Sequence, residues 1–205
     1  METNPFIEKL EKRLRLPLPG HKAHDEMRAG ASRSRFAEKE RQTGAVLIAC
    51  WQEGNKMVFP LIKRTEYEGV HSGQISLPGG KAEPQETATD TALREAEEEI
   101  GLSRSEVRVI GNLSPIEIIA SHFIVTPVIG FAEKSPSLKP NAKEVQRILT
   151  VKLERLLDPA AAAITEILVS GHKVAAPHFA FEGEIVWGAT AMILNELKHI
   201  LQDKN

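Results

Sequence analysis

GKAEPQETATDTALREAEEEIGL, residues 80–102, contains the strongest helix signal of the chain. Thr87 and Asp90 have the spacing of a near-capping box, which favours a helix start at this point. Gly101, followed by apolar Leu102, is typical of the position just after the last helical residue. We therefore predict a well-bounded helix over residues 87–100.

The faces of this helix differ in chemistry. At about 100° per residue, small and apolar residues share one side, which fits close packing on a sheet. Glu95, Glu98 and Glu99 are three and four residues apart, so their carboxylates cluster along the edge of this side, whereas Glu97 points to solvent. The apolar side consists of Ala88, Ala92, Leu93, Ala96 and Ile100.

The clustered carboxylates need a partner, because like charges repel beside a buried face. Mg²⁺ and Mn²⁺ prefer carboxylate oxygen and would offset this repulsion. Taken alone, residues 95–99 are more typical of a solvated glutamate-rich surface. However, Gly79 and Gly80 stand just before the helix and permit close approach of a ligand. Together these features predict a metal site.

The same stretch resembles the signature of Nudix hydrolases, G-x5-E-x7-R-E-U-x-E-E-x-G-U, in which U is a bulky aliphatic residue. Every defined position is matched, with alanine as the smallest acceptable fit at one U. The resemblance implies the α+β class, an α/β/α sandwich with a mixed β-sheet packed between helices. It also implies metal-dependent hydrolysis of a pyrophosphate bond. The matching residues are Gly80, Glu86, Arg94, Glu95, Ala96, Glu98, Glu99, Gly101 and Leu102.

The resemblance further implies roles for single residues. Arg94 would orient the glutamates through an ion pair. A metal that bridges phosphate oxygens would neutralise charge during displacement. The base that activates water stays open: Glu98 is the first choice and Glu144, outside the signature, is the rival. The implied metal ligands are Glu95, Glu98 and Glu99, with the Gly79 carbonyl and Glu86 assisting.

The segment before the signature narrows the choice of substrate. Residues 64–80 read RTEYEGVHSGQISLPGG and resemble the pattern L-L-T-x-R-[SA]-x3-R-x3-G-x3-F-P-G-G of coenzyme A pyrophosphatases. Weaker similarity continues in residues 125–128 and 187–191. The matching positions are Leu61, Arg64, Gly73, Pro78, Gly79 and Gly80. The differing positions are Pro60, Ile62, Thr65, Gly69 and Leu77.

The most important difference is Gly69, because the arginine expected there could hold a phosphate in a fork that glycine cannot supply. His71 is a candidate to compensate. We expect Arg64, His71, Gly79 and Gly80 to bind substrate, although ordinary surface polarity is the alternative for the first two. The leading substrate is coenzyme A or an acyl-CoA, which would give a phosphopantetheine and adenosine 3',5'-bisphosphate.

Two other functions share the signature. One is a hydrolase for ADP-ribose or another nucleoside diphosphate derivative, which would differ outside residues 80–102. The other is a binding module that senses a nucleotide without turnover. The intact glutamates of the signature favour an enzyme over a sensor.

The remaining sequence predicts one domain with an N-terminal extension. Asn4 and Pro5 favour a helix start, and the apolar residues that follow share one face. Residues 1–40 are expected to form this helix and a partly ordered arm that continues to residue 43. Residues 41–205 are expected to form a single Nudix hydrolase domain. Strands are expected at residues 45–51, 57–63, 107–119, 122–131 and 145–153, and one or two more at residues 173–187. A linker helix is expected around residues 160–163, and a final helix at residues 190–202.

Composition excludes several classes of protein. The 205 residues, 41% of them hydrophobic, and the net charge of -2 are typical of one globular domain without a basic nucleic-acid surface. Cys50 is the only cysteine, so the cytoplasm is the expected location. Neither a secretion signal nor a membrane span is expected. We therefore expect a small-molecule nucleotide as partner, no nucleic acid and no membrane. Family members are often dimers, so a homodimer that uses the N-terminal helix is a further expectation.

Some conspicuous side chains are expected to lie in the core rather than the site. Trp51, His122 and Trp187 stand beside apolar strands, where aromatic residues usually pack. Cys50, within an apolar run, is expected to be buried rather than nucleophilic.

Overall fold

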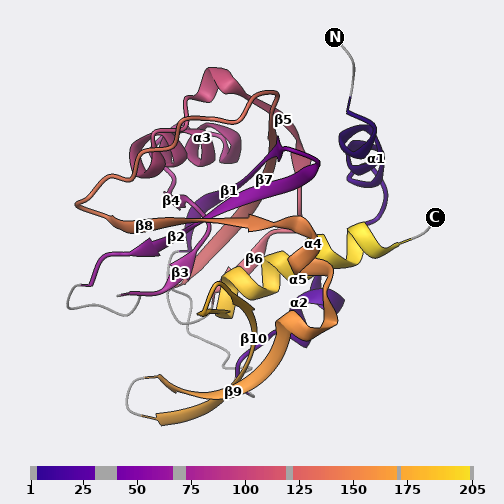
Figure 1. The fold of residues 1–205 in the computed structure, drawn as a ribbon. Helices are drawn as coiled ribbons and strands as arrows, with labels where there is room; N and C mark the ends of the chain where they lie inside the picture. The colour runs from indigo at the N-terminus through magenta and orange to yellow at the C-terminus, as the bar shows by residue number, and fades with distance from the viewer. Residues whose placement is uncertain (1–3, 31–40, 67–72, 119–121, 170–171, 204–205) are drawn as a thin grey trace.

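The computed structural model describes residues 4–30, 41–66, 73–118, 122–169 and 172–203 (Figure 1). No helix within these ranges is long and apolar enough to span a membrane. In chain order the elements are α1 (Pro5–Arg13), α2 (His21–Glu26), β1 (Gln42–Glu53), β2 (Lys56–Arg64), β3 (Ile75–Ser76), β4 (Gly79–Lys81), α3 (Ala88–Ile100), η1 (Arg104–Glu106), β5 (Val107–Asn112), β6 (Ile116–Ile118), β7 (Phe123–Ala132), β8 (Val145–Lys152), α4 (Leu153–Leu157), η3 (Pro159–Ala161), β9 (Ala162–Val169), β10 (His172–Phe181), β11 (Glu184–Trp187) and α5 (Gly188–Gln202).

Strand β1 is central to a mixed eight-stranded sheet. It runs parallel to β7, from Gln42 opposite Phe123 to Trp51 opposite Ala132, and antiparallel to β2 and β4. The main strand order is β3-β2-β1-β7-β5, while β8 pairs with β2 and β6 pairs with β7. A second, antiparallel sheet has the order β11-β10-β9. Helix α3 covers one face of the large sheet, and α4 and α5 lie on the other side (Figure 1). The predicted α+β fold with a mixed sheet between helices is confirmed.

Helix α3 packs on the sheet through small side chains. Ala92 and Ala96 are completely buried, and Ile100 extends the same stripe. Alanines at such a contact let the helix backbone approach the strands closely. The cluster they form is completed by Ala45, Leu47, Ala49, Ile62, Leu102, Val107, Val128 and Val145.

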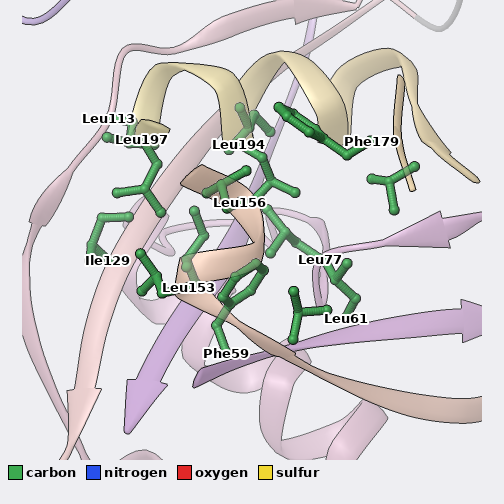
Figure 2. Close-up of a cluster of buried hydrophobic side chains, with 14 of the residues drawn as sticks. Phe59, Leu61, Leu77, Leu113, Ile129, Leu153, Leu156, Phe179, Leu194 and Leu197 are labelled. Carbon is green, nitrogen blue, oxygen red and sulfur yellow. The ribbon is translucent and has the colours of Figure 1, made fainter. Parts of the chain in front are cut away.

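The larger apolar cluster lies on the opposite face of the sheet. Figure 2 shows Leu194 and Leu197 of α5 with Leu153 and Leu156 of α4, above the strand residue Phe59. Each leucine or phenylalanine buried in this way contributes about 1.5–3 kcal/mol relative to an exposed position. This cluster fixes α5 on the sheet, so the two layers of helices hold the strands between them.

A buried polar cluster attaches the N-terminal segment to α5. His24 of α2 and Glu196 of α5 are both buried, and His24 Nε2 lies 2.9 Å from Glu196 Oε2. Glu196 also accepts hydrogen bonds from the backbone amides of Gly20, at 3.0 Å, and Ser114, at 3.1 Å. The partly ordered arm expected from residue 21 thus begins with the short helix α2, which polar long-range contacts stabilise.

Two sequence expectations need correction, and a third is confirmed. Residues 160–163 do not form a linker helix: a single 3-10 turn ends at Ala161, and β9 begins at Ala162. The strand expected at residues 107–119 is divided into β5 and β6, and residue 119 lies outside the described residues. The expectation of one or two strands at residues 173–187 is confirmed: they form the hairpin of β10 and β11, which turns at Glu182 and Gly183. β9 pairs with this hairpin, so its partners rather than its local sequence determine its conformation.

Candidate active site

The start and end of α3 agree with the sequence prediction. The Thr87 hydroxyl accepts a hydrogen bond from the Asp90 amide at 3.2 Å, and the Asp90 carboxylate accepts one from the Thr87 amide at 3.1 Å. Gly101 ends the helix with a left-handed backbone, φ 68°. Such caps satisfy backbone groups that the helix leaves unpaired. They also fix which turn of α3 faces the neighbouring strand β4.

Glycines of β4 bring the backbone close to the glutamates of α3. A Cβ atom at Gly80 would overlap the Glu95 carboxylate. Gly79 has φ 154°, and a Cβ there would overlap the carbonyl oxygen of Ala45 in β1. The glycine pair is therefore required both by the pairing of β4 with β1 and by the position of Glu95.

Arg94 contacts three of the glutamates in the signature. Its guanidinium donates to Glu86 at 2.7 and 3.1 Å, to Glu95 at 2.9 Å and to Glu98 at 3.2 Å. It also donates to the carbonyl of Lys81 at 3.1 Å. Because guanidinium groups are planar and offer several fixed donors, one arginine can hold all these oxygens in place. The predicted ion pairing of Arg94 with the glutamates is present in the structure.

Within the described residues, Glu86 accepts more hydrogen bonds than Glu95, Glu98 or Glu99. Besides Arg94, it accepts hydrogen bonds from the Glu83 amide and the Thr91 hydroxyl, each at 2.9 Å. The hydrogen bonds from Arg94, followed by that from Glu83, lower the pKa of Glu86 to about 2. Glu86 is therefore ionised at neutral pH and anchors Arg94.

Glu99 is almost completely buried beside β4, with 1% of its side chain exposed. It accepts hydrogen bonds from the Gly79 amide at 2.9 Å and from Arg64 Nη1 at 3.3 Å. Burial raises the pKa of Glu99 to about 7, against the lowering effect of these two donors. The negative charges of Glu95 and Glu144 add to the increase. Glu99 is thus a buried carboxylate with acidic neighbours and a single cationic partner among the interactions of the described residues.

Glu144 approaches the site from the segment between β7 and β8. This segment is held to the end of α3 by two backbone hydrogen bonds, Lys139 to Ile100 at 2.8 Å and Asn141 to Glu99 at 2.9 Å. The negative charge of Glu144 raises the pKa of Glu95 and of Glu99, although burial is the largest cause for both. The structure therefore brings the rival base into electrostatic contact with the predicted metal ligands.

Glu97 and Glu98 differ in their surroundings. Glu98 is 55% exposed and keeps its contact with Arg94. Glu97 is 47% exposed and lies 3.7 Å from Arg104, away from the other glutamates. This arrangement agrees with the expectation that Glu97 points to solvent. It also leaves Glu98 accessible to water.

The donor set suits a hard divalent cation, although its side chains do not converge. Within the described ranges, no three Asp, Glu, His or Cys side chains are arranged to hold a metal ion. Arg94 contacts Glu95 and Glu98, and Arg64 contacts Glu99. Carboxylate oxygens are nevertheless the ligands that Mg²⁺ and Mn²⁺ prefer, and Glu95 and Glu99 both have a raised pKa. The ligand assignment for Glu86, Glu95, Glu98, Glu99 and the Gly79 carbonyl stays a prediction.

The structure places three of the four predicted substrate-binding residues at the site. Gly79 and Gly80 lie at the glutamates, while Arg64 faces Glu99. His71 and Gly69 lie outside the described residues. The alternation of side chains along β2 already places Lys63 and Arg64 on opposite faces. This alternation could have shown that Arg64 and Lys63 have different surroundings. Nothing in the sequence identifies Glu99 as the partner of Arg64.

Two of the four conspicuous residues outside the site, Cys50 and Trp51, lie in the core. Trp187 and His122 are only partly buried. The expectation that Cys50 is buried is confirmed, and burial raises the pKa of its thiol to about 12. The reactive thiolate form is thereby disfavoured.

Comparison with known proteins adds independent evidence. The family described as NUDIX domain matches residues 41–169, more than half of the chain. The uncharacterized Nudix hydrolase NudL of Photorhabdus laumondii is 32% identical over 170 residues, 82% of this chain and 89% of NudL. The peroxisomal coenzyme A diphosphatase NUDT7 of Mus musculus is 33% identical over 139 residues, 67% of this chain and 58% of that protein. A solved Nudix hydrolase from Nitrosomonas europaea shares the fold, with a TM-score of 0.50 and 16% identity over 82% of this chain and 74% of its own.

Proposed function

The chain belongs to the Nudix family and is a pyrophosphohydrolase, and from this premise we propose that it hydrolyses coenzyme A or an acyl-CoA. The products would be a phosphopantetheine and adenosine 3',5'-bisphosphate. The arrangement of Glu95 and Glu99 against the glycines of β4 is the observation that supports a diphosphate site. Similarity to a coenzyme A diphosphatase and the partial match of residues 64–80 support this substrate.

A divalent cation is part of the proposal. Nudix hydrolases generally use divalent metal ions, and we propose Mg²⁺ or Mn²⁺ because the donors here are carboxylates. When bound, such an ion supplies positive charge against the phosphate oxygens. Glu95, Glu98 and Glu99 would hold it, with Glu86 and the Gly79 carbonyl assisting.

The side chains around the cation have separate tasks in this proposal. Arg94 keeps Glu95 and Glu98 in position through its contacts at 2.9 and 3.2 Å. Glu98 is the proposed base, because its exposed carboxylate can accept a proton from the attacking water. Glu144 is the rival, since its charge acts on Glu95 and Glu99. Gly80 leaves the space that Glu95 occupies.

Further elements of the proposal come from the sequence alone. We propose a cytoplasmic enzyme that acts on a small nucleotide and not on nucleic acid, in line with the net charge of -2 and the single cysteine. A homodimer is also proposed. Size-exclusion chromatography with light scattering measures its mass directly, and a monomer at working concentration would contradict it.

A product assay tests the proposed substrate. Coenzyme A, acetyl-CoA, ADP-ribose, NADH and diadenosine tetraphosphate are each incubated with the full chain and Mg²⁺ or Mn²⁺, and products are separated by chromatography. The proposal predicts the highest kcat/KM for coenzyme A or acetyl-CoA, with adenosine 3',5'-bisphosphate as product. A preference for ADP-ribose would support the alternative substrate class. Recovery of every ligand unchanged would support a sensor instead.

A further inference from the structure

The contact between Arg64 and Glu99 lies at the end of β2, beside an irregularity in the pairing of β2 with β8. The strand pairs Lys63 with Arg147 on β8, but the next residue, Arg64, pairs with Val145, so the register shifts between them. The extra residue, Gln146, belongs to β8, so side chains keep alternating along β2: Ile62 packs in the cluster of α3 and Lys63 contacts Glu184. Arg64 therefore lies on the face of α3, and its Nη1 is 3.3 Å from Glu99 Oε1.

Glu99 already has a donor on each oxygen. The Gly79 amide donates to Oε2 and Arg64 donates to Oε1. Arg64 is also the cation that lowers the pKa of Glu99 through its charge. Any cation that binds Glu99 must therefore share this carboxylate with the positive charge of Arg64.

Arg64 has donor capacity that the protein does not use. Its Nε is buried without a hydrogen-bond partner among the described residues, and 27% of the side chain is exposed. An unpaired buried N–H is unfavourable, and guanidinium groups bind phosphate oxygens through paired donors. The side chain thus has an unpaired donor and is partly exposed to solvent.

We propose that Arg64 competes with the divalent cation for Glu99. Once the cation is bound, the guanidinium of Arg64 leaves Glu99 and contacts a substrate phosphate. In the metal-free enzyme, Arg64 neutralises Glu99. With the cation in place, repulsion between the two positive charges makes the guanidinium available to an anionic ligand. The inference rests on the proposed function, because it requires a divalent cation at Glu99.

This exchange makes metal binding and phosphate binding cooperative. Removing Arg64 should strengthen metal binding in the absence of an anion, because the competing positive charge is lost. It should weaken anion binding in the presence of metal, because the phosphate loses its fork of donors. A residue that only supports the position of Glu99 would give the opposite sign for the metal, since its loss would disorder a ligand.

Mn²⁺ binding to the full chain tests the proposal by isothermal titration calorimetry, with and without the non-hydrolysable probe methylenediphosphonate. In Arg64→Gln, we expect Mn²⁺ affinity without the probe to rise on the order of ten-fold. Affinity for the probe at saturating Mn²⁺ should fall on the order of ten-fold. Arg64→Lys, which keeps the charge but loses the fork, should retain the wild-type Mn²⁺ affinity and bind the probe weakly. This second variant also serves if Arg64→Gln does not fold.

Lys63→Gln is the matched control, because it removes the same charge one residue earlier on β2. Lys63 pairs with Glu184 at 2.9 Å rather than with a glutamate of α3, so Mn²⁺ affinity should not change. Unchanged or weaker Mn²⁺ binding in Arg64→Gln, with normal binding in the wild type, overturns this inference and leaves the proposed function standing. A wild-type chain that binds no Mn²⁺ overturns both.

Discussion

Arg94 and Glu86 form a two-point ion pair, in which Nε donates to Oε1 at 2.7 Å and Nη2 donates to Oε2 at 3.1 Å. Glu86 is fixed in turn by the Glu83 amide and the buried Thr91 hydroxyl. The remaining Nη1 of Arg94 contacts Glu95 and Glu98. The pair therefore connects a rigid helix start to the carboxylates that the proposed reaction requires.

Arg94→Lys should reduce kcat by roughly ten- to a hundred-fold, the usual effect of losing a residue that orients metal ligands. Lysine keeps the charge but cannot form the two-point contact. Steady-state kinetics measures this change, and thermal unfolding shows whether the variant is folded. Arg104→Lys is the control, since the ion pair of Arg104 within the described residues is with exposed Glu97, at 3.7 Å. Equal kcat in Arg94→Lys and wild type would refute the role of Arg94.

Gly80→Ala should strongly lower activity while the protein stays folded, because its Cβ would displace the Glu95 carboxylate. Gly54→Ala provides the opposite case. Gly54 has φ 61° and nothing within 4 Å of an added Cβ, so alanine there should cost about 1 kcal/mol of stability and no activity. Measuring kcat/KM and urea unfolding for both variants separates the two effects. Normal kcat/KM in Gly80→Ala would show that the position of Glu95 does not matter.

Glu196→Gln should lower the free energy of unfolding by about 2–4 kcal/mol at pH 7, because it removes the charge from a buried hydrogen-bonded pair. Burial alone would raise the pKa of Glu196. The hydrogen bonds from His24, Ser114 and Gly20 nevertheless hold this pKa below its ordinary 4.5. The stabilisation is therefore complete above about pH 5 and is lost as pH falls through the pKa of the folded state.

Urea unfolding between pH 3 and pH 7 measures this dependence. The wild type should lose stability across the acidic part of the range, and Glu196→Gln should lose less there. Glu154→Gln is the control, because Glu154 forms an exposed pair with Lys56 whose removal should change stability by about 1 kcal/mol or less. Parallel pH curves for wild type and Glu196→Gln would contradict the prediction.

Local signals explain how much of the fold could be predicted from the sequence. The bounds of α3 follow from Thr87, Asp90 and Gly101, which act on their own helix. Helix α2 could not be found in this way, since Glu196 stabilises it from 172 residues away in sequence. The alanines around residue 162 have high helix propensity, yet β9 forms there because it pairs with β10. Pairing between distant strands outweighs a weak local preference.

At the candidate site, too, local signals could be predicted from the sequence and contacts between distant segments could not. Periodicity was enough to separate Glu97, which contacts Arg104, from Glu95 and Glu98, which share the contact with Arg94. Arg64 was recognised as a site residue, but its partner Glu99 is 35 residues away in the sequence. Their contact depends on how α3 packs on β2, which no pattern in a single sequence specifies.

The most direct test of the central claim compares Glu99→Gln with Glu97→Gln in the coenzyme A hydrolysis assay with saturating Mg²⁺ or Mn²⁺. Both variants remove one carboxylate charge from the same turn of α3, but only Glu99 lies against Gly79. If the buried carboxylates of α3 support hydrolysis through a cation, Glu99→Gln should lose at least about a hundred-fold in kcat, and Glu97→Gln should stay within about two-fold of wild type. Full turnover by a folded Glu99→Gln, or equal losses in both variants, would contradict the account.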